Sequence, residues 1–363
     1  MRVLVAMSGG VDSSVAAALL RDAGHDVTGV TLKLWGGESD SGCCSVSDVE
    51  DARRVAAQLG IPHYVFNFSD EFGRDVVDPY VSSYAAGETP NPCVECNRSV
   101  KFGRLLDRAL ATGFDAVATG HHARVEPTPD GGFRLLRGAD RAKDQSYVLY
   151  MLGQAELART LLPVGAMTKA EVRATAESLG LRTAQKAESM DVCFITRGGR
   201  ERFLAERGAM QPGTIVEAGT GRTLGRHDGA AAFTVGQRRG LDVAVGERRY
   251  VVDVDASTAT VTIGRRTDLL TDEVVLRGLR WVDAPPLPGD RLDAQPRAHG
   301  PTASCAYGVA HSGTPYAHIT WDEPQPRVAP GQVVALYRGD ELVGGGIATA
   351  PALVDAAPRV SPG

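Results

Sequence analysis

The chain has 363 residues, which predicts two or three domains rather than one. Hydrophobic residues make up 43% and charged residues 23% of the sequence, as in globular proteins, and the formal net charge of -5 gives no global sign of a polyanion-binding protein. Since no run of about 18 apolar residues and no signal-peptide pattern is present, we expect no membrane partner and a cytoplasmic location. Six cysteines in such a chain indicate buried, catalytic or metal-binding thiols rather than structural disulfides.

The first third of the chain alternates predicted strands and helices. Short apolar runs indicate strands, and longer amphipathic runs indicate helices. The expected strands are 2–7, 25–34, 63–67 and 116–120, and the expected helices are 11–23, 48–59, 71–85 and 100–111. Strands separated by helices of this length predict a parallel sheet covered by helices, with ligands bound at the carboxyl ends of the strands.

The second half of the chain changes to short β runs separated by turn residues. It follows helical patterns at 154–162 and 168–179 and an irregular stretch at 185–195. The expected strands are 213–216, 231–235, 249–255, 258–263, 273–282, 303–309, 316–321, 332–337 and 341–348. The predicted fold is α/β, with a parallel-sheet domain followed by two small β domains, the last of them barrel-like. The expected boundaries are 1–200, 201–270 and 271–350, with a flexible tail at 351–363.

Residues 8–14 read SGGVDSS and join the first expected strand to the first expected helix. Glycines let the backbone approach a phosphate closely, and the helix start supplies unpaired N–H groups. A carboxylate at Asp12 then requires Mg²⁺ or an ammonium group to offset its charge. A plain Gly-Ser turn is the alternative. The residues expected to contact a nucleotide are Ala6, Met7, Ser8, Gly9, Gly10, Val11, Asp12, Ser13 and Ser14.

The loop lacks the lysine of a Walker A motif and resembles instead the PP-loop of N-type ATP pyrophosphatases. Those enzymes cleave ATP between its α and β phosphates, which gives an adenylated substrate and pyrophosphate. The resemblance implies ATP and Mg²⁺ as cofactors. It does not choose between enzymes that aminate and enzymes that thiolate.

Two cysteine-bearing segments favour a thiolase. Residues 89–103 read TPNPCVECNRSVKFG, and residues 188–195 read ESMDVCFI. With them, the following blocks make the chain similar to the tRNA-specific 2-thiouridylase (MnmA/TrmU) family over nearly its whole length: GCCS at 42–45, ATGHHAR at 118–124, KDQSY at 143–147, HDG at 227–229, TVGQRRGL at 234–241, PGQ at 330–332 and GGGI at 344–347.

The resemblance implies transfer of sulfur to the wobble uridine of a tRNA, with release of AMP and pyrophosphate. Cys193 would receive a persulfide from a donor protein, such as a cysteine desulfurase or a relay protein. Cys96 would act at the activated base and pair with Cys193 in a disulfide, since releasing persulfide sulfur needs a second thiolate. A buried apolar thiol is the alternative for each cysteine. Basic residues that would favour thiolates are Arg98, Lys101, Lys186, Arg197 and Arg200. We expect a monomer.

Cys93 departs from the aspartate that many members carry, so the acid/base step of that carboxylate must fall to another group. Two interpretations stay open. Cys93 and Cys96 form a redox pair on the persulfide route, which we favour, or Cys93, Cys96 and Cys193 hold a [4Fe–4S] cluster with one open iron. A zinc site is disfavoured because the sequence has no second C-x-x-C. The thiols expected to be packed and not catalytic are Cys43, Cys44 and Cys305.

The resemblance also implies a tRNA-binding face. Asn91, Pro92 and Cys93 would face the target base, which must leave the stack to be attacked. The further tRNA contacts implied are His121, Lys143, Asp144, Gln145, Tyr307 and Gln332, and the residues expected to border the adenosine are Leu32 and Gly120. Phosphates would be gripped by basic stretches at 197–207, 238–239 and 248–249, for which a solvated surface is the alternative.

Two of these contacts carry a specific reservation. For His121, a structural histidine at the end of a strand is the alternative. The Arg-Tyr-Arg stretch of many members reads Ala306-Tyr307-Gly308 here, so a basic contact beside Tyr307 is missing.

Two other functions are compatible with the nucleotide loop. The first is a PP-loop ligase or amidotransferase, which would survive serine substitutions at Cys96 and Cys193. The second is an ATP-sensing or RNA-binding protein without catalysis, which pyrophosphate release dependent on tRNA would exclude.

Overall fold

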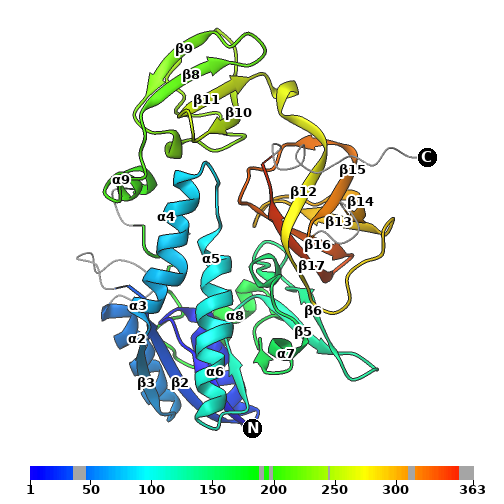
Figure 1. The fold of residues 1–363 in the computed structure, drawn as a ribbon. Helices are drawn as coiled ribbons and strands as arrows, with labels where there is room; N and C mark the ends of the chain where they lie inside the picture. Colours follow the sequence, from blue (N-terminus) through cyan, green and yellow to red (C-terminus); the bar gives the residue numbers. More distant parts are fainter. Residues whose placement is uncertain (36–45, 188–191, 196–198, 244–245, 310–314, 351–363) are drawn as a thin grey trace.

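The computed structural model describes residues 1–35, 46–187, 192–195, 199–243, 246–309 and 315–350. The chain builds a parallel sheet with helices, a small four-stranded sheet and a closed β-barrel, in that order (Figure 1). The predicted fold class is therefore confirmed. In the part of the chain that is described, no helix is long and apolar enough to cross a bilayer.

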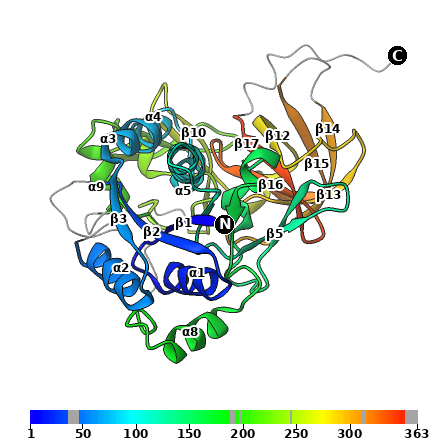
Figure 2. The ribbon, with the colours of Figure 1, turned by 90° about the horizontal axis from the view of Figure 1, so that it is seen from below.

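The N-terminal sheet has five parallel strands in the order β3-β2-β1-β4-β7. They are β1 (Arg2–Ala6), β2 (Asp26–Lys33), β3 (His63–Asn67), β4 (Ala116–Ala118) and β7 (Thr160–Leu161). Val3 and Val5 pack on the face covered by α1 (Val11–Asp22), α2 (Val46–Leu59) and α8 (Lys169–Ser178), whereas Leu4 packs on the opposite face (Figure 2). This alternation follows from the period of two along a strand.

The opposite face is covered by two helical rods, each of which contains a π-helical stretch (Figure 1). The first rod is α3 (Ser69–Phe72), η1 (Gly73–Val77) and α4 (Asp78–Ala85), and the second is α5 (Pro92–Glu95), η2 (Cys96–Leu105) and α6 (Leu106–Ala111). The sequence predicted helix here but not its pitch. π-Helical turns are rare and occur frequently at functional sites, and Cys96 is the first residue of η2.

A short helix, α9 (Gly199–Ala205), precedes the small sheet, whose strand order is β10-β11-β8-β9. Its strands are β8 (Gly213–Glu217), β9 (Thr223–His227), β10 (Tyr250–Asp255) and β11 (Thr260–Gly264). The strand predicted at 231–235 is wrong, since η4 (Ala230–Ala232) closes a 3-10 turn in which Phe233 N donates to Ala230 O. β9 was missed because its residues are mostly polar or half-exposed.

The C-terminal barrel contains β12 (Leu270–Trp281), β13 (Arg291–Gln295), β14 (Ala303–Val309), β15 (Ala317–Pro326), β16 (Val333–Arg338) and β17 (Glu341–Ala348), and η5 (Arg266–Leu269) leads into it. Pairing of β12 with β17 closes it. A glycine in β17 allows this closure, because a Cβ at Gly344 would overlap the carbonyl oxygen of Arg280 in β12 and lie 2.6 Å from the ring of Trp281.

An unpredicted hairpin joins the N-terminal part of the chain to the barrel. It is formed by β5 (Ala123–Pro127) and β6 (Phe133–Arg137), and β6 pairs with β17. η3 (Ser146–Leu149) and α7 (Gln154–Leu157) follow it, and Tyr147 and Leu149 share one apolar cluster with Ala335 and Tyr337. The helix predicted at 154–162 therefore ends early, and Thr160–Leu161 form the edge strand β7.

Candidate active site

The nucleotide loop is fixed by close backbone contacts. Gly9 adopts φ +73°, and a Cβ there would overlap the carbonyl oxygen of Asp48 in the first turn of α2. A Cβ at Gly120, after β4, would lie 2.6 Å from Ser13 N. Gly120 is thus required by its contact with the start of α1. The sequence had instead suggested close approach of the adenosine.

The hydroxyl groups of the loop differ in their availability. Ser14 is fully buried, and its Oγ donates to Gly10 O at 2.8 Å. Ser13 Oγ donates to the same oxygen at 3.2 Å and accepts from Ser8 N. Ser8 is exposed. Of the three expected hydroxyl donors, Ser8 is therefore the one presented to solvent, and the backbone N–H groups of the loop are the other donors available to a phosphate.

Asp12 lies in the first turn of α1, between the ammonium of Lys169 and the imidazole ring of His122. Lys169 Nζ is 2.7 Å from each of its carboxylate oxygens, and His122 Nε2 is 3.2 Å from Oδ1. Burial raises the pKa of Asp12, but hydrogen bonds from His122 and Lys169 outweigh burial, and the net shift is downward. From the sequence we expected Mg²⁺ or an ammonium group beside Asp12. Lys169, 157 positions further along the chain, supplies the ammonium, and the sequence analysis did not identify it.

His121 is buried beside the loop. Its Nδ1 lies 2.7 Å from Thr119 Oγ1, and its ring lies against Phe102. Burial, with Lys101 nearby, lowers the pKa of His121 well below its usual range, so the ring is neutral. These contacts fit the alternative of a structural histidine, and the predicted contact of His121 with tRNA stays a prediction.

Cys96 and Cys193, far apart in the sequence, belong to one large hydrophobic cluster. Cys96 is 8% exposed within it, and the half-buried Cys193 packs against it. Phe194 anchors the second segment, with ring centroids 5.3 Å from Tyr80, 5.3 Å from Phe203, 5.7 Å from Phe72 and 6.2 Å from Trp35. Leu32, predicted to border the adenine, belongs to the same cluster. This packing brings the two thiols to one region.

Most of the basic residues expected around the thiols have other partners. Lys186 Nζ bridges Asp48 at 2.6 Å and Asp51 at 2.7 Å. Arg98 pairs with Glu95, and Arg200 donates to Ala232 O and lies over the Tyr84 ring. Arg197, Cys43 and Cys44 lie outside the described residues. Arg98 and Lys186 are therefore paired with carboxylates, whereas the charge of Arg200 is not neutralised by its carbonyl and ring partners.

The segment 91–93, expected to face the target base, opens α5. Asn91 Oδ1 accepts from Cys93 N at 3.0 Å and caps the helix, Pro92 is buried and Cys93 is half-buried. Gln332 reaches this region from the barrel, 243 positions away, and donates to Thr89 O. A Cβ at Gly331 would lie 2.8 Å from Glu88 Cβ, which explains the glycine of the PGQ block.

Two residues that were predicted to contact tRNA have side chains that are buried in contacts within the protein. Asp144 accepts from Arg137 Nη1 at 2.7 Å and from Gly138 N at 3.0 Å inside the protein. Tyr307 is 5% exposed in the barrel interior, with its ring 5.6 Å from that of Trp281. Gln145 uses its Oε1 to accept from His122 N at 2.9 Å, whereas Lys143 is half-buried.

Cys93, Cys96 and Cys193 do not meet as a set of metal ligands. Within the described ranges, no three His, Cys, Asp or Glu side chains are grouped closely enough to hold a metal ion. The cysteine arrangement therefore does not fit a [4Fe–4S] cluster. Cys305 is buried in the barrel, and burial raises the pKa of its thiol to about 12, as expected for a packed cysteine.

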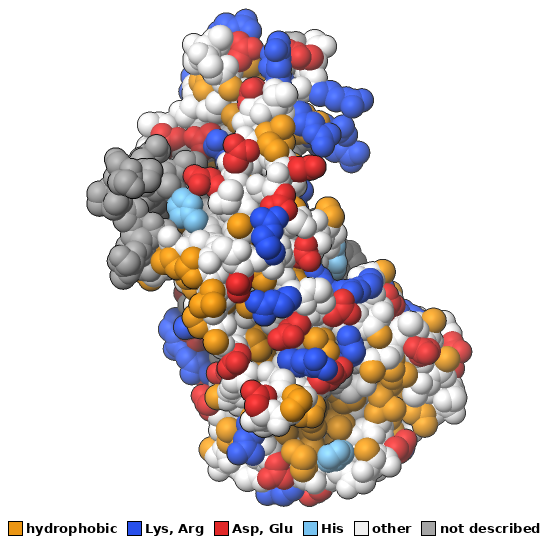
Figure 3. Space-filling view, turned by 90° about the vertical axis from the view of Figure 1, so that its right-hand side faces the viewer, with side chains coloured by type: hydrophobic (Ala, Val, Ile, Leu, Met, Phe, Trp, Pro, Cys, Tyr) orange, Lys and Arg blue, Asp and Glu red, His pale blue; other side chains and the backbone are white. Residues whose placement is uncertain are grey.

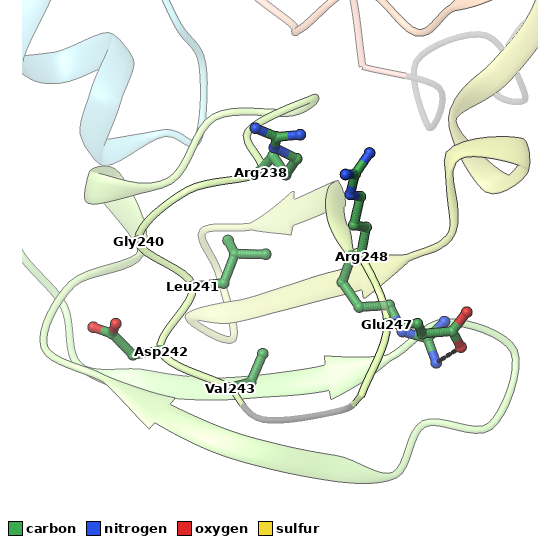
Figure 4. A pocket seen from close by; sticks show the side chains of 8 residues that line it. Arg238, Gly240, Leu241, Asp242, Val243, Glu247 and Arg248 are labelled. Carbon is green, nitrogen blue, oxygen red and sulfur yellow. Dashed lines mark ion pairs between the residues drawn. The ribbon is translucent and has the colours of Figure 1, made fainter.

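A basic hollow of about 550 Å³ lies on the small sheet (Figure 4). The exposed Arg238 and Arg248 extend over it, whereas Arg249 pairs with Glu217 and Glu247. Figure 3 shows Lys and Arg side chains gathered on the upper part of the molecule, above a concave outline. The turn that carries Arg238 touches the other two parts of the chain, because Thr89 Oγ1 donates to Thr234 Oγ1 and a Cβ at Gly236 would lie 3.3 Å from Arg297 Nη2.

Comparison with known proteins gives the same three-part division. Family models match the tRNA methyl transferase HUP domain over residues 1–197, the tRNA methyl transferase PRC-barrel domain over 201–265 and the aminomethyltransferase β-barrel domain over 271–348.

Among curated proteins, the tRNA-specific 2-thiouridylase MnmA of Roseiflexus castenholzii is 47% identical, over 95% of this chain and 98% of its own length. The same enzyme of Chloroflexus aurantiacus is 48% identical, over 95% of this chain and 97% of its own length. Solved structures are more remote. The U34-tRNA thiolase NcsA from Methanococcus maripaludis has 19% identity and a TM-score of 0.36 over 57% of this chain and 63% of its own. A 4-thiouridine synthetase in complex with RNA and ATP has 18% identity and a TM-score of 0.36, over 53% of this chain and 44% of its own. The family models and the near full-length relatives together show that the chain belongs to the family of tRNA-specific 2-thiouridylases.

Proposed function

We propose that this chain is an ATP-dependent tRNA 2-thiouridine synthase that adenylates the wobble uridine and replaces its 2-oxygen with sulfur carried on Cys193. The observation that carries the proposal is that Cys96 and Cys193 both pack in the apolar cluster that also contains Leu32. In this proposal residues 1–200 carry the nucleotide and sulfur chemistry, and the small sheet (201–270) and the barrel (271–350) help to hold tRNA.

In the adenylation step, the 2-oxygen of uridine attacks the α-phosphate of ATP and pyrophosphate leaves. The backbone N–H groups at Gly9 and Gly10, the Ser8 hydroxyl and the positive end of α1 stabilise the phosphate charge. Asp12 is the carboxylate of the loop, but Lys169 Nζ lies 2.7 Å from both of its oxygens, so these residues do not offer it to Mg²⁺. A Mg²⁺ ion that came with the nucleotide would neutralise phosphate charge and take its ligands from phosphate oxygens and water.

In the sulfur step, the terminal sulfur of a Cys193 persulfide attacks C2 of the adenylated uridine. A carbon–sulfur bond forms, and AMP leaves with the former 2-oxygen. The Cys96 thiolate then attacks Cys193 Sγ, which breaks the sulfur–sulfur bond, releases 2-thiouridine and leaves a Cys96–Cys193 disulfide. A two-electron thiol reductant restores both thiols, and a donor protein such as a cysteine desulfurase or a relay supplies the next persulfide.

The basic side chains around the hollow support tRNA binding. Arg238, Arg248 and Arg297 are exposed and belong to two different parts of the fold. Arg297 approaches Gly236 in the turn that carries Arg238, and in the same turn Thr234 contacts Thr89, which precedes the segment 91–93. Phosphates on both flanks of the target base could therefore be neutralised while the base enters beside Cys93.

The experiment that tests the proposal is mass spectrometry of nucleosides after incubation with tRNA, ATP and a persulfide donor. We expect 2-thiouridine with the natural chain and none with Cys193→Ser or Cys96→Ser. Cys305→Ala, which removes a buried thiol outside the cluster, is the matched control and is expected to retain activity. An amidated product, or pyrophosphate release that does not need tRNA, would contradict the proposal.

A further inference from the structure

A lysine outside the nucleotide loop reaches its carboxylate, and the proposed mechanism gives this lysine no role. Lys169 is the first residue of α8, and its ammonium lies 2.7 Å from both oxygens of Asp12. Its side chain is 13% exposed and that of Asp12 is 29% exposed, so the pair is partly withdrawn from solvent. A partly buried ammonium beside an anion-binding loop has a direct electrostatic effect on any phosphate that the loop holds.

The backbone of Lys169 is held firmly relative to the loop. Thr168 and Glu171 form a reciprocal cap at the start of α8, and Lys169 N donates to Asp140 Oδ2 at 3.0 Å. Val172 on α8 shares a buried cluster with Val15 on α1. These contacts fix where α8 begins relative to α1, and the lysine side chain carries an ammonium with three donors on a flexible stem of four methylenes.

Asp12 is held from its other side by His122. The side chain of His122 is 3% exposed, and its backbone N–H donates to Gln145 Oε1. The ring nitrogen Nδ1 has no hydrogen-bond partner among the described residues. The neutral tautomer with the proton on Nε2 fits these contacts, because its single ring N–H then points to Asp12. The carboxylate is thus fixed in place as an anchor for the ammonium.

The position of α8 indicates which end of a nucleotide Lys169 would meet. α8 packs on the sheet face of α1 and α2, whereas Leu32, Cys96 and Cys193 belong to the cluster on the opposite face. A nucleotide whose adenosine lies toward Leu32 would extend its outer phosphates past the loop toward Lys169. Without the ammonium, the carboxylate of Asp12 would repel those phosphates.

We propose that Lys169 binds the two phosphates that ATP loses as pyrophosphate, and that Asp12 and His122 position its ammonium for this contact. The inference rests on the proposed function in taking ATP as the nucleotide and pyrophosphate as the leaving group. In the resting chain Lys169 neutralises Asp12, and with nucleotide bound it bridges Asp12 and a phosphate oxygen.

Calorimetric titration of the full chain with α,β-methylene-ATP, pyrophosphate and AMP, each with Mg²⁺, tests this inference. We expect Lys169→Met to weaken binding of the first two ligands about 10- to 100-fold, because hydrogen bonds to charged groups have this strength, and to leave AMP binding unchanged. Lys169→Arg should recover part of the loss. If Lys169→Met does not fold, Lys169→Gln is expected to show the same selective loss.

Arg21→Met is the matched control, since it also removes a cation that is paired with a carboxylate, but in the last turn of α1, away from the loop. It is expected to leave all three affinities unchanged. Equal weakening of AMP and pyrophosphate in Lys169→Met, or no weakening of either, would overturn the assignment of Lys169 while leaving the proposed function intact. A natural chain that binds none of the three ligands would overturn both.

Discussion

The nucleotide loop and the cysteine cluster are held by different forces. Around the loop, backbone glycine contacts and ion pairs fix the groups, as at Gly120 and at the Asp12–Lys169 pair. Around the cysteines, apolar and aromatic packing does so, with Phe194 as the anchor. The comparison indicates that the groups proposed for adenylation are positioned by ion pairs and backbone contacts, whereas those proposed for sulfur transfer are positioned by apolar packing that excludes water. Mutations should therefore separate the two halves of the reaction.

The largest effect is expected at the aromatic anchor. Phe194→Ala removes a side chain that is 2% exposed and packed against four rings, so we expect a loss of about 3–5 kcal/mol in the free energy of unfolding. Thiolation should fall sharply because Cys193 loses its support, while ATP affinity of the folded protein is kept. Chemical denaturation and nucleotide titration measure the two effects. Phe66→Ala, at a half-exposed ring, is the control, and unchanged thiolation in Phe194→Ala would contradict the comparison.

The next effect is expected at the glycine contact. Gly120→Ala places a Cβ against the backbone of α1, which should cost about 1–3 kcal/mol of stability and weaken ATP binding by displacing the loop. Gly73→Ala serves as the control, since among the described residues nothing lies within 4 Å of a Cβ at Gly73. Equal ATP affinity in Gly120→Ala and the natural chain would show that the loop tolerates displacement.

A smaller effect, which depends on pH, is expected at Asp12. The folded-state pKa of Asp12 is lowered below its ordinary value of 3.8, so its ion pair stabilises the fold above that value and this contribution is lost as the pH falls through the folded pKa. The stability difference between the natural chain and Asp12→Asn should therefore shrink in acid. Denaturant unfolding at pH values above and below 3.8 measures it, and a difference that widens in acid would have the wrong sign.

The smallest effect on tRNA binding is expected at Tyr307. Because its ring is buried in the barrel, Tyr307→Leu should lower stability but leave the tRNA affinity of the folded protein unchanged. An aromatic ring stacked on a base would instead contribute about 1–3 kcal/mol to binding. Binding titrations at fixed salt distinguish a buried ring from a stacked one.

Arg238→Met, which removes an exposed arginine, should weaken tRNA binding and reduce the dependence of that binding on salt concentration.

Local patterns predicted the elements whose cause is local. The SGGVDSS loop, the first strands and the barrel strands other than β13 followed from glycine positions and hydrophobic periodicity, because those features decide backbone conformation over a few residues. The short strand β13 was not predicted. The role of Lys169 and the β5–β6 hairpin could not be predicted in this way. Both depend on contacts between residues far apart in the chain, such as Lys169 with Asp12 and Leu136 with Glu341.

The resemblance to a family predicted the fold better than it predicted the roles of single residues. Asp144 and Tyr307 were assigned to tRNA by alignment of motifs, but burial decides whether a side chain can reach a ligand, and burial is not visible in a motif. Gln332, assigned in the same way, does lie beside the segment 91–93 through its contact with Thr89.

The central claim is that Cys96 and Cys193 act as a pair on one activated uridine. It is tested most directly by a single turnover of persulfide-loaded protein with tRNA and ATP, without added reductant, followed by peptide mass spectrometry. The account predicts a Cys96–Cys193 disulfide in a one-to-one ratio with the 2-thiouridine formed. Formation of 2-thiouridine with both thiols still reduced would contradict it.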